Sequence, residues 1–153
     1  MEVPMLVNDF LYRARDLYGG KEAVVDGSKR FTYSQFAERC FRLANVLTNL
    51  GIQKGDRVGI LSPNSHHFLE SFYGTSLIGA VLVPLNYRLV SADFQYAFSH
   101  AGVRVILADS DLTDLLDEIR KDLPSVEHWI VASFNNAPIP KGWLDWDALV
   151  DEA

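Results

Sequence analysis

The first third of the chain alternates between helical and extended patterns of apolar residues. Apolar side chains three and four positions apart predict a helix over 10–18, with Asn8 as its N-cap. Two short extended runs then flank the dipeptide Asp26-Gly27, which is a strong signal for a β-hairpin. Thr32 and Gln35 have the spacing of a capping box, so they predict the start of a second amphipathic helix.

From residue 57 onward the pattern becomes a repeating strand, loop and helix. The run 80–85 is apolar at every position, as is typical of a parallel strand covered by helices on both faces. We therefore expect it to be the most buried strand. The other expected strands are 57–61, 103–108 and 126–132, and the expected helices are 68–77, 91–101, 109–123 and a terminal helix around Trp146.

Repeated strand–helix–strand units form crossovers of one hand, and such crossovers build a mostly parallel sheet. We therefore predict an α/β fold, namely a doubly wound, mostly parallel sheet flanked by helices, with a small N-terminal hairpin. No internal repeat and no linker-like stretch interrupts the chain, so residues 1–153 are expected to form a single folding unit.

Composition narrows the class of protein. Of the 153 residues, 48% are hydrophobic, which is enough to fill one core. With 22% charged residues, the composition is not that of a disordered chain. The 14 basic and 20 acidic residues give a net charge of −6, which argues against a nucleic-acid partner. The single cysteine, Cys40, excludes a disulfide framework. No stretch has the length and composition of a signal peptide or a membrane span, so we expect a cytoplasmic protein.

The usual chemical motifs are missing from the sequence. It contains neither G-x-G-x-x-G nor G-x-x-x-x-G-K-[ST], so no loop with clustered backbone N–H groups is expected to hold phosphate. The acidic residues of 109–118 suit the first turn of a helix better than a calcium loop. His66 and His67 are adjacent at a helix start, where neighbouring side chains diverge, so we expect surface or half-buried imidazoles that cannot share an ion. No metal site and no catalytic residue is predicted.

The loop after the run 80–85 is the best candidate for a binding site. Asn86, Tyr87 and Arg88 follow the carboxyl end of this strand, and ligands of open α/β sheets gather at such ends. An arginine there can meet a phosphate, and a tyrosine can stack or hydrogen-bond. The alternative is a turn closed by the Asn86 side chain, with Arg88 paired to a nearby acid.

Five segments, taken in order, resemble one known family. They are Thr32-Tyr33-Ser34-Gln35-Phe36, residues 51–60, Ser62-Pro63-Asn64-Ser65, residues 79–89 and residues 103–109. Together they resemble the N-terminal part of AMP-forming acyl-CoA synthetases, in the adenylate-forming family shared with luciferases and peptide-synthetase adenylation domains. The resemblance covers nearly the whole chain from Phe10 onward, and the order of the segments makes it specific.

This resemblance implies that the chain is the N-terminal segment of a larger enzyme. Members of the family join a carboxylic acid to ATP, release pyrophosphate, and pass the acyl group from acyl-AMP to coenzyme A. They need a phosphate loop with a lysine, an acidic Mg²⁺-binding motif and a lysine in a C-terminal domain, none of which has a counterpart in this sequence. ATP, Mg²⁺ and coenzyme A are thus expected as cofactors of the parent enzyme. None is expected to bind this segment, which is predicted to be inactive alone.

By the same resemblance, Asn86, Tyr87 and Arg88 lie near the entrance used by coenzyme A. The Asn-x-Arg-Leu pattern indicates a fatty-acyl or aryl ligase in preference to an acetyl one. The expected partners are the missing C-terminal parts of the parent chain, a fatty or related carboxylic acid, and further copies in a homo-oligomer. Two alternatives stay open. One is a stand-alone, non-catalytic binding or assembly module of the same fold, and the other is a flavodoxin-like nucleotide-binding domain.

Overall fold

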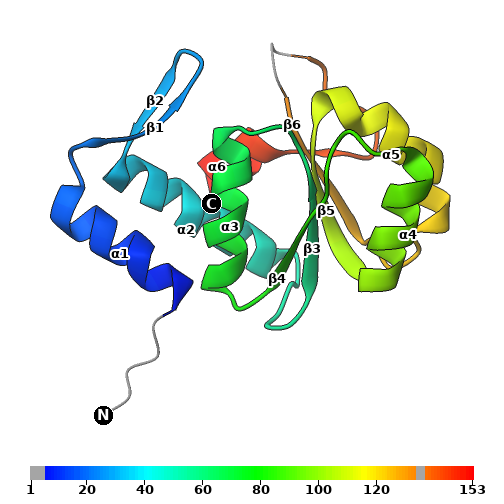
Figure 1. Ribbon diagram of the computed structural model, residues 1–153, viewed down its shortest axis with the longest axis horizontal. Helices are drawn as coiled ribbons and strands as arrows, with labels where there is room; N and C mark the ends of the chain where they lie inside the picture. Colours follow the sequence, from blue (N-terminus) through cyan, green and yellow to red (C-terminus); the bar gives the residue numbers. More distant parts are fainter. Residues whose placement is uncertain (1–5, 134–136) are drawn as a thin grey trace.

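A parallel sheet of five strands forms the centre of the molecule (Figure 1). The computed structural model describes residues 6–133 and 137–153. The strands of the sheet are β3 (Arg57–Leu61), β4 (Val81–Pro84), β5 (Val103–Asp109), β6 (His128–Ala132) and β7 (Leu144–Asp145). Their spatial order is β4-β3-β5-β6-β7, and every neighbouring pair is parallel.

Helices cover both faces of this sheet, as the alternating pattern predicts (Figure 1). They are α2 (Tyr33–Asn49), α3 (His66–Leu77), α4 (Ser91–Ala101), α5 (Thr113–Ile119) and α6 (Trp146–Glu152). On one face α4 and α5 pack against Ile106 and Val131, whereas α2, α3 and α6 pack on the other face against Ile60 and Leu107. The predicted doubly wound α/β fold is confirmed.

The predicted hairpin is present, and it lies apart from the five-stranded sheet, against α2 and α3 (Figure 1). Its strands β1 (Glu22–Asp26) and β2 (Lys29–Thr32) pair antiparallel, with Asp26 opposite Lys29 at the turn. Gly27 lies in the left-handed region with a φ of 57°, a conformation that glycine adopts at little cost. The hairpin contacts α2 and α3. Because the Asp26 carboxylate accepts the backbone N–H of His66, the turn of the hairpin lies next to the start of α3.

The two N-terminal helices, α1 (Val7–Tyr18) and α2, begin in different ways. Thr32 caps α2 as predicted, because its hydroxyl accepts the Gln35 backbone N–H and the Gln35 side chain accepts the backbone N–H of Thr32. The prediction for Asn8 is wrong, since α1 has Leu6 at its N-cap. Asn8 instead donates to the carbonyl of Ser76 at 3.1 Å and accepts its hydroxyl at 2.6 Å, which ties α1 to α3.

The run 80–85 is not the most buried strand. β4 lies at the edge of the sheet, and the side chain of Val81 is 49% exposed, whereas β5 in the centre is buried at every position except Arg104. An apolar run indicates that a strand favours burial, but the crossover connections determine where that strand lies in the sheet. Here the crossover through α3 places β4 outside β3, and no described strand pairs with the outer side of β4.

The carboxyl-terminal part departs from expectation in two further places. β5 extends through Asp109, so the helix expected over 109–123 is reduced to α5 between two short 3₁₀ turns. These turns are η1 (Ser110–Leu112) and η2 (Arg120–Asp122). The two-residue strand β7 was not predicted, because it is too short to show a period. Across the described residues, no helix has the length and apolar character that a membrane span requires.

Candidate functional site

The carboxyl ends of β3 and β5 form the point at which the chain leaves the sheet toward opposite faces. β3 leads into α3 on one face, and β5 leads through η1 into α5 on the other. Such switch points are where open α/β sheets bind ligands. The residues that follow β3, together with those that reach them from other elements, are therefore the first candidates for a site.

The three residues of the predicted coenzyme site form an exposed turn after β4. The Asn86 side-chain oxygen accepts the backbone N–H of Arg88 at 3.1 Å, so the turn closed by Asn86 is present. Arg88 is exposed and makes no ion pair with any residue in the described ranges, and its guanidinium carbon lies 5.4 Å from the Tyr87 ring centroid. The structure thus brings the three residues together and leaves the arginine head group open to solvent.

The turn between β3 and α3 uses its hydroxyl groups internally. Ser65 accepts the backbone N–H of Phe68 at 3.3 Å and caps α3, as its position in the sequence predicts. Ser62 donates to the carbonyl of Pro63 at 2.9 Å, and both serines are buried. The hydroxyl groups of both serines are thus bonded within the turn and the start of α3.

His66 and His67 follow this turn, and the prediction made for them is wrong. Both side chains are 1% exposed, and their ring centroids are 3.8 Å apart. The prediction considered α3 alone, whereas in the structure the hairpin lies against one side of this helix start and α6 against the other. Five charged residues from these elements and from α2 surround the pair. The histidine cluster, as we name it, consists of Asp26, Lys29, Arg39, His66, His67, Glu70 and Asp147.

His66 is held by the hairpin. Its backbone N–H and its ring Nδ1 both donate to the Asp26 carboxylate, at 2.9 and 2.6 Å, and Lys29 Nζ lies 3.4 Å from its Nε2. Burial lowers the pKa of His66, the adjacent His67 lowers it further, and the bond to Asp26 opposes both. The same bond lowers the pKa of Asp26, so a carboxylate faces a neutral imidazole.

His67 is held by the C-terminal helix. Its Nε2 lies 3.2 Å from Asp147 Oδ1, which also accepts from the Arg39 guanidinium at 2.7 Å. The hydrogen bond with His67 and the bond from Arg39 hold the pKa of Asp147 well below its usual range. Lys29 Nζ is 3.7 Å from the other oxygen of Asp147, so the hairpin, α2, α3 and α6 meet at one carboxylate.

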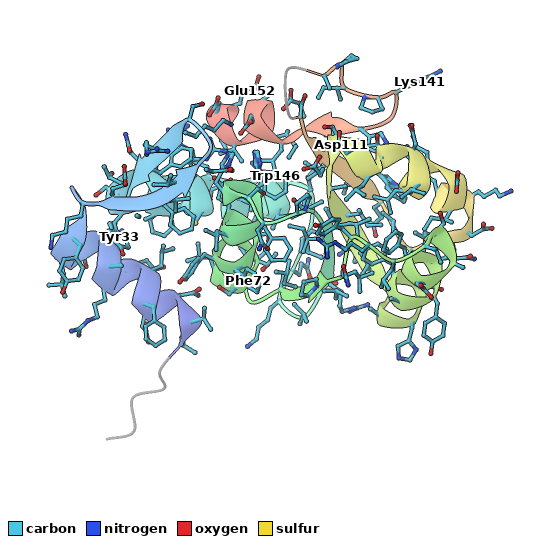
Figure 2. The ribbon with its side chains drawn as sticks, turned by 45° about the horizontal axis from the view of Figure 1, so that its top comes forward. Tyr33, Phe72, Asp111, Lys141, Trp146 and Glu152 are labelled. Atoms are coloured by element: carbon cyan, nitrogen blue, oxygen red, sulfur yellow. The ribbon has the colours of Figure 1, made fainter. Side chains whose placement is uncertain are left out.

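Glu70 is the most deeply buried member of the cluster. Its carboxylate has 0% exposure and accepts Arg39 Nε at 2.5 Å and the Trp146 indole N–H at 3.2 Å. Figure 2 shows Trp146 where α6 meets α3. Burial raises the pKa of Glu70, and the hydrogen bond from Arg39 opposes that rise. Burial would lower the pKa of Arg39, but its bonds to Glu70 and Asp147 raise it instead. The Arg39–Glu70 ion pair, with the bonds from Trp146 to Glu70 and from Arg39 to Asp147, joins α2, α3 and α6.

Three members of the cluster have the geometry of a metal-ligand set. His66, His67 and Asp147 each offer one ligand atom, and these atoms lie within 4.8 Å of one another. Sequence reasoning missed this set because Asp147 is 80 residues from His67 and no local spacing signals their contact. The available signal was the pair of histidines one short turn after the buried strand β3, at a position where ligands gather.

Comparison with known proteins assigns the chain to a family. A family model described as AMP-binding enzyme matches residues 11–151. The long-chain-fatty-acid–CoA ligase of Thermus thermophilus is 37% identical over 150 residues, which is 95% of this chain and 27% of that protein. The long-chain-fatty-acid–CoA ligase FadD13 of Mycobacterium tuberculosis is 42% identical over 106 residues, which is 67% of this chain and 21% of that protein.

Solved structures agree with this assignment. The inhibitor-bound N-terminal domain of FACL13 from Mycobacterium tuberculosis superposes with a TM-score of 0.86 at 31% identity, over 98% of this chain and 36% of that one. The anthranilate CoA ligase AuaEII superposes with a TM-score of 0.89 at 24% identity, over 99% of this chain and 28% of that one, which shows a shared fold. The chain spans about a quarter of the length of the curated relatives just named. Since the family model covers nearly all of it, this chain belongs to the AMP-binding enzyme family.

Proposed function

We propose that this chain is part of an AMP-forming ligase that activates a fatty or related carboxylic acid. The acid and ATP give acyl-AMP and pyrophosphate, and coenzyme A then displaces AMP to give the acyl-CoA thioester. The observation that carries the proposal is the family match over residues 11–151, together with 37–42% identity to two proteins named as long-chain-fatty-acid–CoA ligases. ATP and coenzyme A are the co-substrates of this reaction, with Mg²⁺ bound to ATP.

Within this ligase, the chain supplies scaffold, and the groups that hold ATP and Mg²⁺ come from other segments. Two observations support this division. The sequence contains no glycine-rich phosphate loop with a lysine, and in the turn between β3 and α3 the hydroxyl groups of Ser62 and Ser65 are bonded within the turn and the start of α3. The isolated chain is therefore proposed to have no ligase activity.

The turn of Asn86, Tyr87 and Arg88 is proposed to contact a phosphate of coenzyme A. A guanidinium that is exposed, supported by an aromatic ring and without a carboxylate partner among the residues the structure describes is suited to binding an incoming phosphate. Asn86 fixes the backbone of the turn, so it presents Arg88 in one direction. In this proposal Asn86 positions the turn, and Arg88 makes the charge-assisted contact.

The proposed partners are the rest of the parent protein and further copies of the chain, in the cytoplasm. The outer side of β4 has no partner strand among the described residues, and several large apolar side chains are exposed, among them Leu69, Phe72 and Val81. Such an edge and such a surface favour pairing with another polypeptide. Sedimentation velocity over a concentration series is expected to show a dimer or a larger closed assembly of the isolated chain. A 17.2 kDa monomer at the highest concentration would contradict this.

The most direct test of the ligase proposal starts from the reading frame that contains this chain. The frame is expected to continue into a glycine-rich loop with a lysine, and its product is expected to catalyse ATP–pyrophosphate exchange with fatty acids. A stop codon after Ala153 would support the stand-alone binding module instead. Exchange by the isolated 153-residue chain, retained after repurification, would show that the chain contains a catalytic site.

Arg88→Ala in the product of that frame tests the coenzyme contact. The KM for coenzyme A is expected to rise about tenfold or more, with adenylate formation nearly unchanged, because the lost contact holds a ligand of the second half-reaction. Arg13→Ala, which removes another arginine far along the chain from the turn, is the matched control. Equal losses in both half-reactions would instead identify Arg88 as structural.

A further inference from the structure

The histidine cluster contains a set of possible metal ligands, and Asp26 in the hairpin fixes the orientation of one of them, His66. The His66 backbone N–H and ring Nδ1 lie 2.9 and 2.6 Å from the same Asp26 carboxylate oxygen, so the ring proton is placed on Nδ1 and the Nε2 lone pair faces Lys29 Nζ at 3.4 Å, where a cation can replace the ammonium group. A carboxylate that fixes a histidine through its second nitrogen is the usual outer partner of a metal-binding histidine. His66 therefore has the tautomer and the support that a metal ligand requires.

The second and third ligand atoms lie at a suitable separation. His67 Nε2 and Asp147 Oδ1 are 3.2 Å apart. Two ligands about 2.0–2.1 Å from a tetrahedral ion are separated by about 3.3 Å. His67 Nε2 can bind an ion only as an unprotonated nitrogen, so the ring proton of His67 then lies on Nδ1. The atoms of the full set of three are within 4.8 Å of one another.

Lys29 already holds a positive charge beside this set. Its Nζ lies 3.4 Å from His66 Nε2 and 3.7 Å from Asp147 Oδ2, so the ammonium group sits between two of the three ligands. The Lys29 and Asp147 side chains are 50% and 34% exposed, which leaves an ion a route to the ligands and lets the flexible lysine stem swing into solvent.

The charge count allows this exchange. Three carboxylates in the cluster, those of Asp26, Glu70 and Asp147, face the cations Arg39 and Lys29, so these five side chains sum to −3 + 2 = −1. With a divalent ion in place of the Lys29 ammonium, the sum is −3 + 1 + 2 = 0. A divalent ion thus neutralises the cluster better than the lysine does.

We propose that His66, His67 and Asp147 bind a divalent transition metal of the Zn²⁺ class, in competition with the Lys29 ammonium group. Two imidazoles and one carboxylate suit Zn²⁺ or Co²⁺ and are poor ligands for Mg²⁺ or Ca²⁺. The proposal does not rest on the ligase function, since it concerns only residues of this chain and is tested without substrates.

The test is a titration of the 153-residue chain with Co²⁺, followed by visible absorption, and with Zn²⁺ in competition with a chromophoric chelator. We expect one ion per chain. His66→Gln and Asp147→Asn are each expected to weaken binding about tenfold or more, and Asp26→Asn, which acts through His66, by about tenfold. His100→Gln removes an exposed histidine outside the cluster and is expected to leave the affinity unchanged.

Lys29→Met is the decisive variant, because the proposal predicts that it binds Zn²⁺ more tightly than the wild-type chain. Removing the competing charge is expected to tighten Zn²⁺ binding about tenfold or more, an effect that partial unfolding cannot produce. Far-UV circular dichroism establishes that each variant is folded. Three results would overturn the proposal: absence of binding to the wild-type chain, loss of binding in His100→Gln but not in His66→Gln, or unchanged affinity in Lys29→Met.

Discussion

The two faces of the sheet are joined to their helices in different ways. On the face of α4 and α5 the contact is a continuous apolar cluster, in which Phe94 and Phe98 pack with Ile106 and Val131. On the opposite face an apolar cluster around Leu107 is continued, at the carboxyl end of β3, by the charged residues of the histidine cluster. The first kind of contact depends on shape and burial, and the second on matched charges, so they should respond to different perturbations.

The largest loss of stability is expected from the apolar face. Phe98→Ala removes a ring with 0% exposure from the cluster under α4 and is expected to lower the free energy of unfolding by about 3–5 kcal/mol. Because no titratable group contributes to the change, the loss should be the same in mildly acidic and in neutral buffer. Urea denaturation measures both quantities.

Phe72→Ala is the matched control for this prediction, since Phe72 is 43% exposed on the outer side of α3 (Figure 2). It is expected to cost less than about 1 kcal/mol. Similar losses for the two variants would mean that the α4 face is not packed as described.

The charged face is expected to respond to the loss of one partner. Glu70→Leu leaves the half-buried Arg39 without its closest carboxylate, so the free energy of unfolding should fall by about 3 kcal/mol. The double variant Arg39→Met/Glu70→Leu replaces both charges by apolar groups and is expected to recover at least about 1 kcal/mol of that loss. A double variant less stable than the single one would contradict the buried pair. Glu38→Leu, which breaks an exposed pair with Arg42, should change stability by less than about 0.5 kcal/mol.

A smaller effect, which depends on pH, is expected at the opposite end of the sheet. Arg104 donates to Glu127 at 2.7 and 2.8 Å and also to Asp56. The bonds from Arg104 lower the pKa of Glu127 below 4.5, and the Gln53 backbone N–H together with Arg104 lowers that of Asp56 below 3.8. A carboxyl group with a lowered folded-state pKa stabilises the fold above its ordinary pKa, and this stabilisation is lost as the pH falls through the folded-state value.

Arg104→Met should therefore lower the urea midpoint of unfolding at neutral pH. The midpoints of this variant and of the wild-type chain should converge as the pH falls below about 4. A difference that stays constant from neutral to acidic pH would show that Arg104 acts through packing alone. Phe98→Ala is the reference variant, because the stability that it loses is expected to be the same from neutral to acidic pH.

The apolar face could be predicted from the sequence, and the charged face could not. The stripe that contains Phe94 and Phe98 and the closing Gly102 predict α4 from local spacing. The histidine cluster depends on contacts between distant residues, from Arg39 and Glu70, 31 positions apart, to Arg39 and Asp147, 108 positions apart, which no local pattern contains. The same limit explains the error on β4, since an apolar run does not reveal whether a strand lies in the centre or at the edge of a sheet.

The turn at residues 86–88 could be predicted from the sequence in part. Its position after a strand and its closure by Asn86 follow from local chemistry, and both are present in the structure. The alternative interpretation also included an acidic partner for Arg88, which is a tertiary contact and is absent from the ranges that the structure describes. Local signals thus predicted where the turn lies and not what surrounds it.

His66 is a buried, neutral imidazole that Asp26 fixes from the hairpin. Long-range ¹H–¹⁵N correlation of the imidazole nitrogens at neutral pH tests this most directly, because it reports which ring nitrogen carries the proton. We expect His66 to be the Nδ1–H tautomer, with a pKa below its ordinary value of 6.5, and to lose this preference in Asp26→Asn. An Nε2–H tautomer, or a His66 that titrates at 6.5 and is unaffected by Asp26→Asn, would contradict the account.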